Sequence, residues 1–294
     1  MPLDGAGVDD PSIWRPEAAA PYRRSTWRPT WNIAIPAAML LLIGFSCFLL
    51  PLILSIPEPV GGNVLEATRP TFTEGHFLGT DLNGNDVLSR LLFGGRASLR
   101  IAVAVNLIGL LVGGALGAFG AYVGGLADSL IMRIFDVLIA FPSLVLVVAI
   151  AQAAGPSELN TIWALAFFSV PAFARVARAA TLRLREQPFV AAATLSGSSR
   201  LRVLTGHVAP NILPQLVTLA LLGMGISIIL EGALSYLGLG VPAPAPSWGS
   251  MIAHGQQAVV TRPMLLVFPS AFLFATVLSF NLLGDALRER WNAL

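Results

Sequence analysis

The segment Leu182–Pro214 reads LRLREQPFVAAATLSGSSRLRVLTGHVAPNILP and separates two long apolar stretches of the chain. It is polar and rich in arginine, with alanine and glycine near its centre. Apolar stretches that dissolve in lipid leave such a segment in water, and arginine-rich loops of membrane proteins stay in the cytoplasm. The pattern predicts a membrane protein whose longest interior aqueous segment is available to a cytoplasmic partner.

Composition places the rest of the chain in the membrane. Of 294 residues, 55% are hydrophobic and 12% are charged, whereas charged residues make up about 25% of an ordinary soluble domain. Apolar runs of roughly 20 residues span a bilayer as helices. The sequence therefore predicts one all-α integral membrane domain, with six transmembrane helices at 34–56, 101–123, 137–154, 161–173, 213–237 and 265–283.

Two features of these spans carry structural expectations. The fourth span is short, so Arg175 and Arg178 are expected to reach from its end toward the membrane surface. On the second span, glycines at a spacing of four predict close packing of another helix. They are Gly109, Gly113 and Gly117, with Gly114 adjacent.

Arginines give the orientation of the chain. Sorting the loops alternately places thirteen of the 18 arginines, Arg133 among them, on the side of the two termini. By the positive-inside rule this side is cytoplasmic. The segments 57–100 and 239–262 are then expected outside, and 183–214 is expected inside.

The residue types needed for most chemistry are scarce. All 18 basic residues are arginines, and a phosphate-binding loop needs a lysine, so any nucleotide is predicted to bind another subunit. His76, His207 and His254 lack the spacing of metal ligands, and no catalytic residue is predicted. Cys47 stands alone, which excludes an internal disulfide.

Glu231 is the one serious candidate for an acidic residue inside the spans. It would either line a water-filled path or hydrogen-bond across helices, and both readings stay open. An ion-coupled secondary transporter usually buries several such acids, so that alternative is disfavoured but retained. A membrane hydrolase or transferase would need a cluster of His, Asp or Glu near a membrane face, which the sequence does not suggest.

Four segments, in order, carry a resemblance to a known family. They are HFLGTDLNGNDVLSRL at 76–91, Asp136 followed by AFPS at 140–143, LSYLGLGVPAPAPSWG at 234–249, and FNLLGDALR at 280–288. The chain resembles the permease subunit of ATP-binding-cassette (ABC) importers, in particular the C-type component of the dipeptide, oligopeptide and nickel class. Asn85 and Ala243 depart from the family's Arg and Pro.

This resemblance implies a role for the segment 183–214. In such permeases it forms a short coupling helix that docks into an ATPase, and Ala191 stands where the family has Glu. The positions that match the coupling motif or flank it are Ala191, Ala192, Ala193, Gly197, Arg200, His207 and Pro210. For the translocation path or its outer gate, the predicted residues are Glu231, Tyr236 and Trp248.

The resemblance also implies a fold and an assembly. The fold is expected to be the type I ABC importer transmembrane domain at 101–290, preceded by a cytoplasmic tail at 1–32 and by the first span with its outward segment at 33–100. The expected partners are a second permease in a heterodimer, two ATPases that carry ATP and Mg, an extracytoplasmic solute-binding protein and lipid, but no nucleic acid. The chain is expected to lie in a bacterial inner membrane and to import di- or oligopeptides, or a related small solute, by alternating access.

Overall fold

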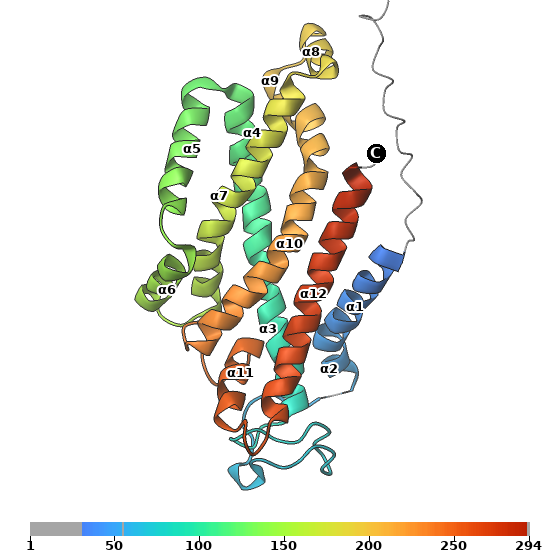
Figure 1. The fold of residues 1–294 in the computed structure, drawn as a ribbon, viewed down its shortest axis with the longest axis vertical. Helices are drawn as coiled ribbons and strands as arrows, with labels where there is room; N and C mark the ends of the chain where they lie inside the picture. The colour runs from blue at the N-terminus through green and yellow to red at the C-terminus, as the bar shows by residue number, and fades with distance from the viewer. Residues whose placement is uncertain (1–30, 55, 293–294) are drawn as a thin grey trace, which may run out of the picture.

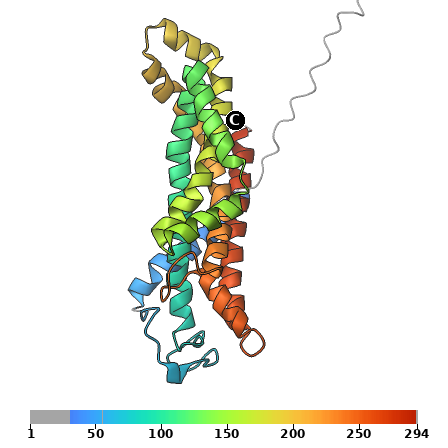
Figure 2. The same cartoon turned by 90° about the vertical axis from the view of Figure 1, so that its left-hand side faces the viewer.

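A computed structural model describes residues 31–54 and 56–292. In this part of the chain the regular structure is helical, and the extended pairing consists of two isolated bridges, Thr73 with His76 and Thr80 with Asp86. Figures 1 and 2 show an elongated bundle whose long helices run along one axis. All but the last two residues of the predicted tail 1–32 lie outside the described residues, and Trp31 begins the first helix.

Five helices or continuous helical runs in the described chain are long and apolar enough to cross a membrane. They are α1 (Trp31–Phe48), α3 (Val87–Ile108) continuing through the π turn Gly109–Gly113 into α4 (Gly114–Val123), α7 (Glu158–Arg185), α9 (Arg200–Val203) continuing through the π turn Leu204–Val208 into α10 (Ala209–Tyr236), and α12 (Met264–Asn292). A sixth span results if α5 (Gly125–Ile139) and α6 (Ser143–Ala154) are taken together. The short elements are α2 (Leu50–Ile53), the 3₁₀ turn Val64–Glu66, α8 (Pro188–Leu195) and α11 (Trp248–Gln257).

The third predicted span, 137–154, is wrong as a single helix. The chain already turns into α5 at Gly125, and α5 and α6 meet at an angle of 84°. Pro142 explains the break, because a proline disfavours helical backbone at the preceding residue, here Phe141. Arg133 therefore lies within α5 and not in a loop.

Two other boundaries also differ. The helix predicted at 161–173 continues to Arg185, so Arg175 and Arg178 lie inside α7 and pair with aspartates instead of ending a short span. The second span begins at Val87, where Asp86 caps the helix by accepting a 2.7 Å hydrogen bond from the Ser89 N–H. The boundary placed at residue 100 consequently falls within α3.

The glycine ladder packs where the sequence predicts. A Cβ on Gly113 would lie 2.2 Å from the Val170 carbonyl oxygen, and one on Gly117 would lie 2.1 Å from that of Ala174. Only glycine allows α4 and the preceding π turn to approach α7 this closely. The ladder thus fixes the position of α7, which leads directly into the segment 183–214.

Candidate coupling helix and interior polar site

The segment 183–214 forms an elbow at one end of the bundle. After α7 ends at Arg185, α8 begins at Pro188, whose fixed φ suits the first helical position. Figure 1 places α8 and α9 at the end opposite the segment 57–86, and the C-terminal end of α12 points the same way. The predicted short helix is therefore present and projects beyond the long helices.

Gly197 ends this helix by a specific backbone geometry. Its φ is +82°, a conformation that glycine adopts without strain. Its N–H donates to the Thr194 carbonyl at 3.1 Å, and the Ser198 N–H donates to the Ala193 carbonyl at 3.2 Å. This is a Schellman motif, which turns the chain sharply so that Ser199 can cap α9.

The surface of the elbow is unusually apolar for a segment outside the spans. Ala191 and Ala192 are exposed and Ala193 is half-buried. Leu195 is 89% exposed and Leu201 is 69% exposed. Exposed apolar side chains outside the long helices are of the kind that proteins use to bind partners.

The remaining residues of the predicted coupling motif continue from the elbow into α10. Arg200 is exposed in α9, and His207 is exposed in the π turn that follows. The Asn211 side chain donates to the His207 carbonyl at 2.6 Å, and Pro210 stands in the first turn of α10. Neither His207 nor Pro210 belongs to α8. The coupling motif therefore extends from α8 through α9 and the π turn to the start of α10.

Glu231 lies in a polar site between α3 and α10. Its carboxylate is fully buried and accepts hydrogen bonds from the Ser98 hydroxyl at 2.7 Å and from the Ser235 hydroxyl at 2.6 Å. The sequence left two alternatives for Glu231, a water-filled path or a hydrogen bond across helices. The contact with Ser98 is a hydrogen bond across helices. In this conformation the side chain does not reach the surface.

Trp248 fastens α11 to the same site. It is fully buried, its indole N–H donates to the Leu91 carbonyl at 3.0 Å, and its backbone N–H donates to the Ser98 hydroxyl at 3.4 Å. Tyr236, by contrast, is 43% exposed, and its hydroxyl contacts Gln256. The three residues predicted for the path or gate are thus two buried anchors and one surface residue, and their role in transport remains a prediction.

Substitution of Glu231 tests whether ATP or a proton gradient drives transport. Glu231→Gln keeps the size of the side chain and one acceptor oxygen, so ATP-driven uptake is expected to stay within about twofold of the wild type. Glu231→Ala should destabilise the chain by roughly 2–4 kcal/mol, because it leaves a cavity and two unpaired hydroxyls. Uptake and thermal unfolding of the purified variants measure both. A pH-shifted or abolished uptake in Glu231→Gln alone would instead favour a proton-coupled transporter.

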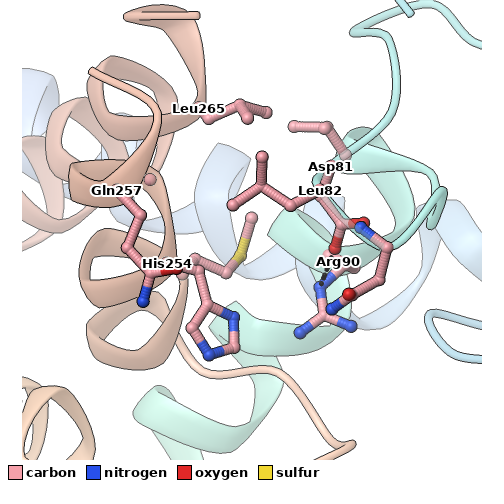
Figure 3. A pocket seen from close by; sticks show the side chains of 10 residues that line it. Asp81, Leu82, Arg90, His254, Gln257 and Leu265 are labelled. Atoms are coloured by element: carbon pink, nitrogen blue, oxygen red, sulfur yellow. Dashed lines mark hydrogen bonds and ion pairs between the residues drawn. The ribbon is translucent and has the colours of Figure 1, made fainter. Parts of the chain in front are cut away.

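A pocket of about 190 Å³ lies at the end of the bundle opposite α8. Figure 3 shows Asp81 and Arg90 on one side, His254 and Gln257 of α11 on another, and Leu265 of α12 above. The Arg90 guanidinium pairs with Asp81 at 3.2 Å and donates to the Pro59 carbonyl at 3.0 Å. Arg90 therefore holds the segment 57–86 against the helices, which accounts for Asp81 and Arg90 in the motif at 76–91.

Sequence reasoning missed a set of charges on α5 and α7. Arg178 binds Asp128 through two hydrogen bonds of 2.6 and 2.7 Å, and Arg175 binds Asp136 at 2.7 Å. The predicted spans place 124–136 between two helices, so Asp128 is not among the residues that the sequence singles out. The helical spacing of its charged residues, opposite a stripe of leucine and isoleucine, was the available signal.

A bundle of helices long and apolar enough to span a membrane, with a water-exposed helix at one end, defines the class of polytopic helical membrane proteins. The sequence model of the family described as "Binding-protein-dependent transport system inner membrane component" matches residues 106–292. The chain belongs to this family.

Individual relatives agree with this assignment. The chain is 41% identical over 214 residues to the glutathione transport system permease protein GsiD of Pectobacterium atrosepticum, covering 73% of this chain and 71% of the relative. It is 39% identical over 214 residues to the dipeptide transport system permease protein DppC of Alkalihalophilus pseudofirmus, covering 73% and 70%. These matches confirm the predicted ABC permease of the peptide class and give no support to the secondary transporter.

A solved structure confirms the predicted type I importer fold. The chain superposes on a chain of the MetNI methionine ABC transporter, captured in inward-facing conformations, with a TM-score of 0.54 and 18% identity. The match covers 68% of this chain and 95% of the other. At this identity the likeness concerns the fold alone.

Proposed function

We propose that this chain forms half of the path through an inner-membrane importer of di- or oligopeptides, and that the elbow at α8 couples it to an ATPase. The observation that carries the proposal is the exposed apolar surface of the elbow, Leu195 and Leu201, at the end of the bundle from which α8 projects. A helix of this size inserts into a cleft of a partner and transmits its movement. Peptide-like solutes are proposed because the relatives named above carry glutathione or dipeptides.

In the proposed assembly the ATPases supply the energy and the permeases form the path. Two ATPases bind ATP and Mg on the side of α8 and close on each other, and the coupling helices of two permeases transmit that closure. A second, different permease completes the path, and a solute-binding protein docks at the opposite end, where the segment 57–86 and the pocket beside Arg90 lie. This places the end with α8 and both termini in the cytoplasm. Four of the thirteen arginines counted there, at positions 15, 23, 24 and 28, lie outside the described residues.

Purification with the associated subunits tests the proposal. Isolated through an affinity tag from its native membrane, the chain is expected to bring two ATPase copies and one other permease, identified by mass spectrometry. Reconstituted with its binding protein, the complex should accumulate a dipeptide only when ATP is present on the α8 side. Accumulation by the isolated chain on an ion gradient would overturn the proposal.

A further inference from the structure

Helix α5 has three distinct faces. Phe135 is buried against the bundle, and a second face is an exposed apolar stripe. That stripe consists of Leu126, Leu130, Ile134 and Val137. The third face is polar and lines a pocket with α7, formed by Gly125, Asp128, Ser129, Met132, Arg133, Asp136, Arg175 and Arg178. A helix that is apolar on one exposed side and charged on the other meets two different environments.

The charged face lies deep within the bundle's length. Figures 1 and 2 show α5 running alongside α4 and α7, not across the end of the bundle. At 1.5 Å per residue, Asp136 lies about 16 Å along α5 from Gly125, and Arg175 lies about 15 Å before the end of α7 at Arg185. The Asp136–Arg175 pair therefore lies well inside the ends of both helices, about one turn before the break, which falls within the membrane if α5 and α6 together form one span.

Hydrocarbon is an unfavourable neighbour for this face. The Asp136 side chain is 61% exposed and that of Arg175 is 49% exposed, so the pair opens outward from the chain. Ionisable groups at this depth face a bundle interior or a water-filled cavity, since exposing them to hydrocarbon is costly. In this chain the remaining possibilities are water in a path or another protein.

The break between α5 and α6 is a second, independent indication that this region faces water or protein and not lipid. Ala140, Phe141 and Pro142 are exposed, and no side chain caps the first turn of α6. Irregular backbone at membrane depth persists only where it is buried in protein or lines water. The break directly follows the charged face, so both belong to one wetted surface.

We propose that the pocket between α5 and α7 is the inner, water-filled vestibule of the translocation path, and that its arginines contact a carboxylate of the passing solute. The inference rests on the proposed function, because a path exists only if the chain is a permease. The pocket holds three arginines against two aspartates. Arg133 is exposed and has no ion-pair or hydrogen-bond partner in the described part of the chain. It is the free charge available to an anionic group, such as the C-terminal carboxylate of a peptide.

Cysteine labelling in the complete transporter tests the vestibule without knowledge of the solute. Met132→Cys places a thiol on the pocket lining, and Leu130→Cys places one on the apolar stripe of the same helix. The unsubstituted chain is the blank, because its Cys47 is fully buried. Mass spectrometry of this subunit follows the reaction with an anionic sulfonatoethyl and a cationic trimethylammonium-ethyl methanethiosulfonate, each rate normalised to that of a free thiol.

Met132→Cys is expected to react with both reagents, and roughly three- to tenfold faster with the anionic one, because the excess charge attracts it. Adding Arg133→Gln should remove that preference and adding Arg133→Lys should retain it, whereas Leu130→Cys should stay unreacted. Absence of labelling at Met132→Cys, equal labelling of both positions, or an anionic preference that survives Arg133→Gln would overturn the inference.

Uptake of dialanine separates this inference from the proposed function. Arg133→Gln should lower ATP-driven dialanine uptake several-fold, with Arg133→Lys near wild type. Arg133→Lys, which keeps the charge at the same position, is the matched control. If the wild-type complex does not carry dialanine, the proposed peptide function fails while the labelling still decides the vestibule. Normal dialanine uptake by Arg133→Gln would contradict the solute contact.

Discussion

The Ala192→Arg substitution is expected to reduce ATP-driven uptake more than tenfold while the chain still folds in the membrane. Ala192 is exposed on α8, so the larger side chain breaks no contact within the chain. It would instead stand between α8 and the ATPase cleft, where a small side chain permits close insertion. Loss of a hot-spot contact near the centre of an interface costs about 2 kcal/mol or more, which exceeds a tenfold loss of affinity.

The measurement is the ratio of solute transported to ATP hydrolysed in proteoliposomes that contain the complete complex. Ala192→Ser is the matched control, since it keeps the side chain small, and it should give the wild-type ratio. Both variants should be recovered from the membrane in equal amounts. Wild-type uptake by Ala192→Arg would show that α8 is not the coupling contact.

The Gly117→Ala substitution is expected to destabilise the permease by 1–3 kcal/mol or more, the usual range for overpacking. The added Cβ would lie 2.1 Å from the Ala174 carbonyl oxygen, and it has no rotamer by which to move away. Both atoms are tied to helical backbone, so α4 and α7 would have to separate. The elbow would move with the end of α7, and coupling should weaken together with stability.

Gly114→Ala provides the comparison at a neighbouring position. Its Cβ would lie 3.1 Å from the end of the Leu216 side chain, which can turn aside. After heating in detergent, Gly117→Ala is expected to lose its monodisperse gel-filtration peak at a lower temperature than Gly114→Ala. Equal heat resistance of the two variants would mean that the close approach of α4 and α7 contributes little.

Some residues of the candidate site could be predicted from short sequence motifs, and others could not. The resemblance, carried by Gly197 and the alanines before it, implied the short helix, and the structure ends that helix at Gly197 through its positive φ. Burial of Glu231 and Trp248 was not predictable, since Ser98 and Leu91, their partners, are far away in the sequence. The predicted spans leave out 124–136, because the polar stripe of α5 lowers the mean hydropathy of this helix.

By itself, the sequence determined the membrane class, the helical nature of the chain, its family and the presence of an elbow at 183–214. The membrane class and the helices follow from hydropathy and from the need to satisfy backbone hydrogen bonds in lipid, whereas the family and the elbow follow from the motifs that carry the resemblance. Tertiary structure alone decided which charges meet and which side of α5 turns its charges toward α7. Those outcomes depend on packing between α5 and α7 and on ion pairs across the bundle, and no local stretch of sequence encodes such distances.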